Sequence, residues 1–163
     1  MINIGLISDT HGWIHPRVFS FFEKCDEIWH AGDIGSLRIY DKINEIKPLR
    51  AVYGNIDGKE IRSFCKEYEF FEIDSLLVLM MHIGGYPNRY SKLAKQLIAK
   101  YKPQLFISGH SHILKIMPDS KNNLLHINPG AAGNYGQHVL ITAVRFKIMK
   151  GNITDLEILE IPR

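Results

Sequence analysis

Two histidines, His110 and His112, stand one residue apart directly after a short apolar run. The run Gln104–Ser108 is predicted to be a buried strand, and Gly109 then allows backbone angles that other residues avoid. In an extended segment, residues two apart point to the same face, so both imidazoles are expected to face one pocket. Neutral imidazole is a common ligand of divalent transition metals. A pair of hydrogen-bonding loop histidines is the alternative, because so short a motif also occurs by chance.

Further residues with metal-ligating side chains follow other predicted strands. They are Asp9, His11, Asp33, Asn55 and His82. The strands that they follow are Ile2–Ser8, Glu27–His30, Leu49–Val52 and Leu76–Met81. In open α/β sheets ligands bind at the carboxyl ends of the strands, so we expect these side chains to meet there. Each residue alone has an ordinary alternative role, such as helix capping, turn formation or a solvated loop position.

The combined ligand set contains carboxylate, amide and imidazole groups and no thiolate. This composition disfavours a structural zinc site and favours a catalytic site for Mn, Fe, Ni, Co or Zn. The set is larger than one catalytic ion needs, whereas two ions that share a carboxylate would use all of it. A carboxylate can give one oxygen to each ion, but a single imidazole lone pair cannot be shared.

Periodicity in the rest of the chain predicts alternating strands and helices, followed by a β-rich end. Helices are predicted at Pro16–Lys24, from a Ser36 cap to about Ile46, and at Ser91–Tyr101. Additional strands are predicted at Tyr68–Ile73, Lys115–Met117, Leu124–Ile127, Val139–Ile148 and Ile153–Ile161. There is no repeat or linker, so we expect a single domain over residues 1–163.

Composition and charge exclude several classes of protein. Of the 163 residues, 45% are hydrophobic and 23% are charged, which is ordinary for a globular domain. The net charge of +3 is spread along the chain, so we expect no sequence-specific nucleic-acid partner. Cys25 and Cys65 lack zinc-type spacing and are expected to be reduced thiols. No signal peptide or bilayer-length apolar run is present, so we expect a cytoplasmic protein without a membrane partner.

The order of these motifs resembles that of the calcineurin-like metallophosphoesterases. The motifs are Asp9-x-His11, Gly32-Asp33, Gly54-Asn55, His82 and Gly109-His110-x-His112. The segment Asn128-Pro129-Gly130 resembles a further motif of the small single-domain phosphodiesterase branch of bacteria and archaea. The resemblance implies an α/β fold, a four-layer α/β/β/α sandwich of two mixed β-sheets flanked by helices.

The resemblance also implies an activity. The family members are phosphoesterases with a binuclear metal centre, in which a metal-bound hydroxide attacks phosphorus in line. For this chain we expect a phosphodiesterase rather than a phosphomonoesterase, acting on a small phosphoester substrate. Two divalent ions are the expected cofactors, with manganese first and nickel, cobalt, iron or zinc as alternatives.

Carried over by position, the resemblance divides the ligands between two ions. The first ion would be held by Asp9, His11 and His112, the second by Asn55, His82 and His110, with Asp33 as the bridge. In the larger family a histidine after the Gly-Asn pair helps to protonate the leaving group. This chain has Ile56 there, which cannot transfer a proton, and Asp57 is expected to accept a hydrogen bond from a ligand imidazole. The family usually has glycine directly after the ligand equivalent to His82, whereas Ile83 intervenes here.

No motif identifies the substrate-binding residues, and specificity is expected in the loops Ile83–Arg89 and Ala131–His138. His138 itself is expected to be a surface residue or an ordinary core residue. The alternative function is a non-catalytic interaction scaffold, related to the retromer-type coat subunit, which would not need the histidine set. A single-ion hydrolase acting on carbon is a third alternative, although it would leave part of that set unused. The sequence leaves the oligomeric state open, including a homo-oligomer.

Overall fold

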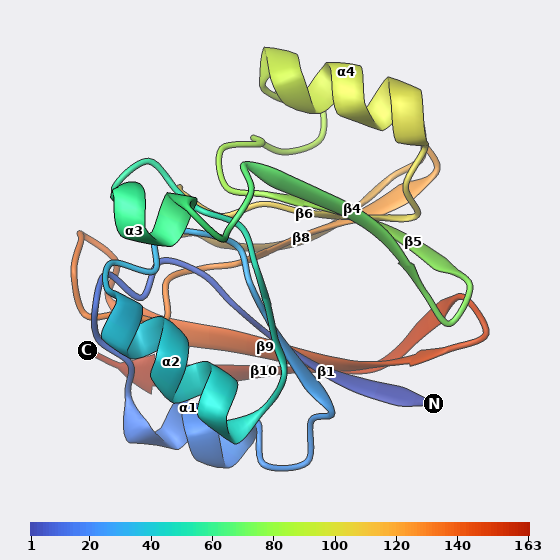
Figure 1. The fold of residues 1–163 in the computed structure, drawn as a ribbon. Helices are drawn as coiled ribbons and strands as arrows, with labels where there is room; N and C mark the ends of the chain where they lie inside the picture. The colour runs from blue at the N-terminus through green and yellow to red at the C-terminus, as the bar shows by residue number, and fades with distance from the viewer.

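Ten strands and four helices make up the computed structural model, which describes residues 1–163 (Figure 1). The first sheet contains β1 (Ile2–Ile7), β2 (Glu27–His30), β3 (Leu49–Ala51), β9 (Leu140–Met149) and β10 (Asn152–Pro162). The second contains β4 (Tyr68–Ile73), β5 (Leu76–Met81), β6 (Leu105–Ile107), β7 (Leu114–Asp119) and β8 (Leu124–Pro129). Their strand orders are β10-β9-β1-β2-β3 and β4-β5-β6-β8-β7. Both sheets are mixed, with β1, β2 and β3 parallel in one and β5, β6 and β8 parallel in the other.

The helices are α1 (Pro16–Phe21), α2 (Leu37–Ile46), α3 (Lys59–Arg62) and α4 (Lys92–Tyr101). Helices α1 and α2 cover the outer face of the first sheet and α4 covers that of the second, whereas α3 lies beside the loops at one edge (Figure 1). Ser36 Oγ caps α2 by accepting the backbone N–H of Ile39 at 3.3 Å, and Ser91 Oγ caps α4 in the same way. No helix combines the length and the apolar composition that crossing a membrane requires.

Three apolar cores separate the layers. The central core lies between the sheets and includes Leu6 and Val78, which are fully buried. A second core packs α1 and α2 on the first sheet through residues such as Ile43. A third packs α4 on the second sheet, where Leu97 lies over Phe106. This arrangement of helix, sheet, sheet and helix confirms the predicted four-layer sandwich.

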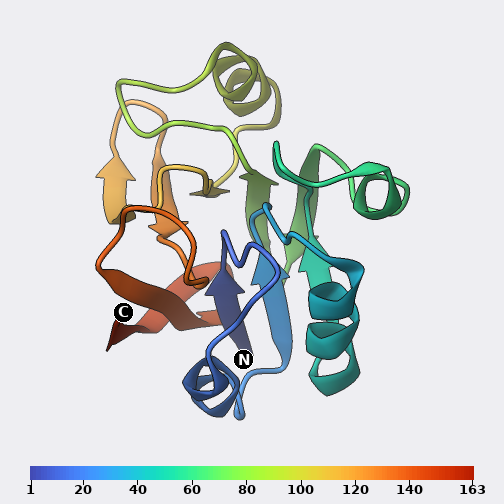
Figure 2. The same cartoon turned by 90° about the vertical axis from the view of Figure 1, so that its left-hand side faces the viewer.

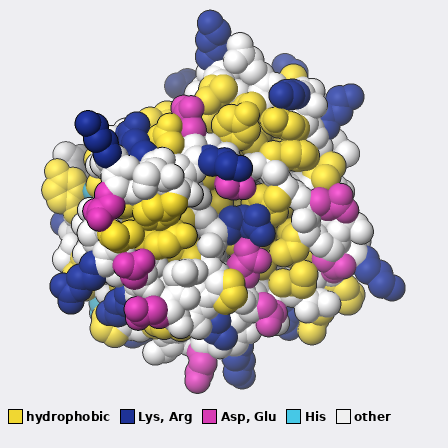
Figure 3. Space-filling view, viewed as in Figure 1, with side chains coloured by type: hydrophobic (Ala, Val, Ile, Leu, Met, Phe, Trp, Pro, Cys, Tyr) yellow, Lys and Arg dark blue, Asp and Glu magenta, His cyan; other side chains and the backbone are white.

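The loops at the carboxyl ends of the parallel strands meet at one edge of the sandwich. These loops follow β1, β2, β3, β5 and β6, and the edge faces the viewer in Figure 2. On the face drawn in Figure 3, acidic and basic side chains are interspersed, and histidine appears only at the left margin. The histidine-rich edge is therefore distinct from the mixed charged surface around it.

Two local predictions were wrong. The helix predicted at Pro16–Lys24 ends at Phe21, because the next N–H groups turn back onto nearer carbonyls and Phe22 becomes buried against Gly5. Helix α3 was not predicted, since a single turn is too short to show helical periodicity. The other elements lie within two residues of their predicted bounds.

Candidate metal centre

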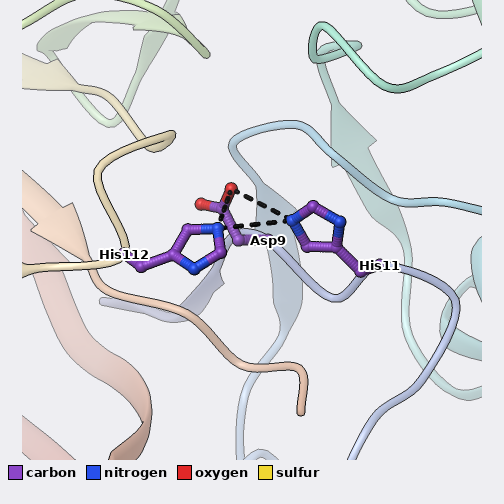
Figure 4. Close-up of side chains that lie close together, drawn as sticks. All are labelled: Asp9, His11 and His112. Atoms are coloured by element: carbon purple, nitrogen blue, oxygen red, sulfur yellow. Dashed lines mark hydrogen bonds and ion pairs between the residues drawn. The ribbon is translucent and has the colours of Figure 1, made fainter. Parts of the chain in front are cut away.

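Asp9, His11 and His112 form one group of converging side chains (Figure 4). Asp9 Oδ1 lies 3.2 Å from Nε2 of His112 and 3.7 Å from Nε2 of His11. The two imidazole Nε2 atoms are 3.3 Å apart. The first two residues come from the loop after β1 and the third from the loop after β6, which are brought together by the packing of the two sheets.

Asp33, His82 and His110 form a second group beside the first. Asp33 Oδ2 lies 3.2 Å from His82 Nε2. Asn55 joins this group, because its Oδ1 lies 3.0 Å from His110 Nδ1. The structure thus brings the sequence-predicted ligands together in the same two sets that the family resemblance implied.

Asp33 lies between the two groups. Its Oδ2 is 3.2 Å from His82 of the second group and 3.6 Å from His11 of the first. The other oxygen, Oδ1, accepts the backbone N–H of Ile56 at 3.1 Å, which fixes the carboxylate in this orientation. Gly54 makes the close approach possible, since a Cβ there would lie 2.0 Å from Asp33 Oδ1. This position is the one that a bridging carboxylate would occupy.

The backbone is strained at most of these residues. Asp9, His11 and Asp33 have φ values of 54°, 47° and 56°, in the left-handed region that side-chain-bearing residues rarely adopt. His110 and His112 have φ values of 71° and 59°, so the prediction that they lie in an extended segment was wrong. The chain turns after Gly109 instead, and the two imidazoles go to different groups. Such conformations cost on the order of 1 kcal/mol or more each and cluster at functional sites.

Two buried polar atoms in the centre have no hydrogen-bond partner. They are Asp9 Oδ1 and His82 Nε2, whose residues are 0% and 3% exposed. Most buried polar groups in proteins are hydrogen-bonded, so an unpaired pair of acceptors at one place requires an explanation. A divalent cation would satisfy both atoms, and the carboxylate and imidazole donors around them suit such an ion. The residues present therefore fit the metal centre that the motifs predict.

Hydrogen bonds around the centre leave lone pairs aimed into it. Because a carbonyl oxygen only accepts, the 2.8 Å contact of His82 Nδ1 with Ala31 O requires a proton on Nδ1. In the neutral ring, His82 Nε2 then has its lone pair toward Asp33. Asp9 is oriented similarly: Ser8 Oγ and the backbone N–H of His110 donate to Oδ2, leaving Oδ1 free. These contacts preorganise the ligand atoms.

His138 was not identified from the sequence, and it contacts His112. His138 Nε2 donates to Gly133 O at 2.9 Å, so its Nδ1 is the acceptor when the ring is neutral. Burial lowers the pKa of His138, which favours that neutral form. His112 Nδ1 lies 3.3 Å from this acceptor and donates to it, leaving His112 Nε2 unprotonated toward Asp9. The two histidines are too far apart in the sequence for spacing to have indicated their contact.

Asp57 does not contact a ligand imidazole, contrary to the prediction. Its buried carboxylate accepts backbone N–H groups of Ile34 at 3.1 Å, Gly35 at 2.8 Å and Gly54 at 2.8 Å. Those donors belong to the loops that carry Asp33 and Asn55. Charged carboxylates form strong hydrogen bonds to backbone amides, so Asp57 ties the two loops together. Its role is in the geometry of the loops rather than in the protonation of an imidazole.

Asn128 anchors the loop that carries the two C-terminal histidines. Its side-chain amide donates to Gly109 O at 2.9 Å and to Ser111 Oγ at 3.1 Å. Its Oδ1 accepts the backbone N–H of Gly130 at 2.9 Å. The Asn128-Pro129-Gly130 motif therefore acts on the ligand loop through hydrogen bonds.

Charge within the centre favours ionised carboxylates. Burial acts to raise the pKa of Asp9, but the neighbouring imidazoles of His11, His112 and His82 outweigh it and hold the pKa well below its usual range. Burial and the His82 contact oppose each other in the same way at Asp33, whose pKa is also lowered. Both groups are consequently anions at neutral pH, the form in which carboxylates bind metals.

His30 lies near the centre but is not one of its ligands. Its Nδ1 accepts the backbone N–H of Gly32 at 3.2 Å, and its Nε2 donates to Thr10 Oγ1 at 2.9 Å. The Thr10 hydroxyl then donates to Ile34 O. Both ring nitrogens are thus used, and burial lowers the pKa of His30 to about 4.

Comparisons with known proteins identify the family of the chain. Residues 2–151 match the calcineurin-like phosphoesterase superfamily domain. A protein of Methanothermobacter thermautotrophicus named as a probable metallophosphoesterase is 30% identical over 78% of this chain and 76% of its own length. One of Methanocaldococcus jannaschii with the same description is 31% identical over 78% of this chain and 67% of its own.

Solved structures of two kinds share the fold. An archaeal phosphodiesterase superimposes with a TM-score of 0.78 at 21% identity, covering 98% of this chain and 100% of the other. Vps29 of Chaetomium thermophilum superimposes with a TM-score of 0.76 at 14% identity, covering 99% and 97%. At these identities the superpositions establish the fold alone, whereas the sequence matches establish the family. The chain belongs to the calcineurin-like phosphoesterase superfamily.

Proposed function

We propose that the chain is a phosphodiesterase that depends on two divalent metal ions. The observation that carries the proposal is the pair of ligand groups around Asp33, with unpaired buried acceptors on Asp9 and His82. The first ion would be held by Asp9, His11 and His112, and the second by Asn55, His82 and His110. Asp33 would contribute to both, since its Oδ2 lies near a histidine of each group.

The protein residues set the geometry in which that chemistry would occur. When bound, two such ions acidify water and neutralise the non-bridging oxygens of a phosphate during in-line displacement. His138 and Ala31 hold His112 and His82 with their ligating nitrogens unprotonated. Manganese is the first candidate metal, followed by nickel, cobalt, iron and zinc, all of which accept mixed oxygen and nitrogen ligands.

The residue after Asn55 favours a diester with a good leaving group. Ile56 presents a 46% exposed aliphatic side chain, and only its backbone N–H takes part in the centre, through Asp33. An aliphatic side chain cannot protonate a leaving oxygen. The fold shared with an archaeal phosphodiesterase supports the same preference. The proposed substrate is a small phosphoester rather than a nucleic acid recognised by sequence.

The non-catalytic scaffold remains a second candidate because the chain also shares the Vps29 fold. A scaffold would gain nothing from burying unpaired acceptors or from holding ligand residues at positive φ, both of which cost stability. The enzyme is the better explanation of these two features.

Metal content and turnover of a nitrophenyl phosphodiester test the proposal. Wild-type protein reconstituted with Mn, Ni, Co or Zn should retain about two ions per chain and release nitrophenolate, and chelation should abolish release. Asp33→Ala should lose both metal retention and turnover, because both groups lose a shared ligand. Asp41→Ala, an exposed charge change on α2, is the matched control and should behave as wild type.

Three outcomes would contradict the proposal. A firm limit of one ion per chain would favour the single-ion hydrolase. Absence of turnover with every metal would favour the scaffold. Normal activity in folded Asp33→Ala would mean that the centre lies elsewhere.

A further inference from the structure

A pocket of about 240 Å³ adjoins the candidate metal centre, with which it shares His110. Its walls come from the loop between β5 and α4, from β7 and from β8. The residues that matter here are Tyr86 and Arg89 on the loop, Lys115 on β7 and His126 on β8. None of these residues is a proposed metal ligand.

The lining of the pocket includes cationic side chains and no acidic one. Arg89 and Lys115 are its charged lining residues, and none of the lining residues is an aspartate or glutamate. Lys115 Nζ lies 3.8 Å from the centroid of the Tyr86 ring, and neither cation takes part in a salt bridge. By contrast, Arg145, which lines a pocket elsewhere on the chain, is paired with Glu157 at 2.7 Å. The pocket beside His110 is therefore suited to an anion.

His126 lies in the wall of this pocket and has an unpaired hydrogen-bond acceptor. The side chain is 0% exposed, and its Nδ1 donates to Phe106 O at 3.2 Å. The remaining nitrogen, Nε2, therefore has a lone pair, and it has no partner in the structure. Burial lowers the pKa of His126 to about 4, which keeps the ring neutral. A bound group with a hydroxyl or N–H could satisfy this acceptor.

The loop that carries Tyr86 and Arg89 is held in place by hydrogen bonds. Ser108 Oγ donates to Gly85 O at 2.9 Å, and the backbone N–H of Ser91 donates to Gly84 O at 2.9 Å. A turn is closed by the N–H of Arg89 and the carbonyl of Tyr86 at 2.8 Å. This anchoring reduces the ordering cost of binding, because the wall of the pocket is already formed.

We propose that this pocket binds a second phosphate group of the substrate, carried by one arm of the phosphodiester. The inference rests on the proposed function, because the scissile phosphate would lie at the metal centre next to His110. Arg89 and Lys115 would donate to the second phosphate, as both side chains commonly do. The sugar or base that carries this phosphate would supply the donor for His126 Nε2. The substrate class is thus a phosphodiester of a phosphorylated nucleoside or sugar.

Equilibrium binding of two product-like probes tests this inference without turnover. Adenosine 3′,5′-bisphosphate and adenosine 3′-phosphate differ only in the second phosphate, and both are titrated calorimetrically onto metal-loaded protein. Wild type should bind the bisphosphate about tenfold more tightly, the size expected for charge-assisted hydrogen bonds. Arg89→Gln and Lys115→Gln should each remove most of this ratio. Lys42→Gln on α2 makes the same charge change away from the pocket and should keep it.

His126→Phe tests the acceptor separately. It preserves an aromatic ring and should weaken both probes about threefold while leaving their ratio unchanged. Equal binding of the two probes to wild type, or a ratio that Arg89→Gln and Lys115→Gln leave unaltered, would overturn the inference. Turnover of the nitrophenyl diester is measured in parallel. If the nitrophenyl diester is hydrolysed but the two probes bind equally, only the proposed phosphate pocket is refuted. If the bisphosphate binds more tightly but the diester is not hydrolysed, only the proposed phosphodiesterase activity is refuted.

Discussion

Removal of the Asp57 carboxylate should destabilise the protein and loosen the metal centre together. The carboxylate accepts three backbone N–H groups, those of Ile34, Gly35 and Gly54. Asp57→Ala leaves all of these donors without a partner. Asp57→Asn keeps one oxygen, which can replace Oδ2 and retain the bonds to Ile34 and Gly54, but its NH₂ group faces the N–H of Gly35. The alanine variant should therefore be affected more than the asparagine variant.

The size of the effect follows from the number of donors. A buried donor left unsatisfied costs about 1–3 kcal/mol. Taking the lower half of that range for each of the three donors, because water can enter the vacated space, Asp57→Ala should lower the free energy of unfolding by about 3–6 kcal/mol. Asp57→Asn should lower it by about 1–2 kcal/mol on the same basis. Domains of this kind have stabilities of only about 5–15 kcal/mol, so the alanine variant should approach unfolding.

Urea denaturation in chelator measures these changes, and calorimetric metal titration measures the consequence for the centre. Asp57→Asn should remain folded and bind metal about 10–100-fold more weakly, since the loops carrying Asp33 and Asn55 lose an anchor. Asp41→Asn is the matched control and should leave both quantities unchanged. Wild-type stability and metal affinity in Asp57→Ala would refute the reasoning. Equal destabilisation by Asp57→Ala and Asp57→Asn would refute the argument that the loss of stability follows the number of unsatisfied N–H donors.

Three further predictions concern single residues. His138→Ala should weaken metal binding about 10–100-fold in calorimetry, because His112 loses the acceptor that sets its tautomer. His138→Gln offers an acceptor and should restore part of the affinity. Protonation of His126 should lower the unfolding free energy in chelator by about 3 kcal/mol between pH 7 and pH 4, because its pKa is lower folded (about 4) than unfolded (6.5), and buried His30 adds a similar fall. His126→Gln should remove only the His126 contribution, and unchanged pH dependence in this variant would contradict the prediction. Because Ile56 stands where the larger family has a proton donor, the rate of diester hydrolysis should fall steeply as the pKa of the leaving group rises. If the chemical step is rate-limiting and the rate does not depend on this pKa, another general acid must be present.

Sequence reasoning predicted which residues would lie together, because the parallel strands that precede them end at one edge of a sheet. Asp9, Asp33 and His82 each follow an apolar run, and parallel strands carry such residues to the same edge of a sheet. The two groups that the structure brings together were implied by the resemblance to the metallophosphoesterases. The spacing of the apolar residues predicted the capped helices and the hairpin β4–β5. A side chain on a buried face is apolar, so the spacing of apolar residues follows the period of the helix or strand.

Tertiary contacts and backbone torsion angles could not be predicted from the sequence pattern. The left-handed turn at His110 depends on Gly109, which approaches Ser8 so closely that a Cβ would lie 2.1 Å from its Oγ. The contact of His138 with His112 depends on how the loop after β8 folds back. Asp57 was expected to face an imidazole because only its position in the chain was known. Neither periodicity nor spacing reports such contacts.

The features that suit the centre to a cation also oppose folding without one. Asp9 and His82 bury unpaired acceptors, and Asp9 is also one of the ligands held at positive φ. Folding requires that these costs be offset elsewhere, and the structure shows where: in the amide contacts of Asp57, in the loop anchor of Asn128 and in the core between the sheets. A cation that paired the buried acceptors would stabilise the folded state by its binding free energy. A site whose ligand geometry is formed before the ion binds needs its strained ligand residues to be held by rigid surrounding contacts.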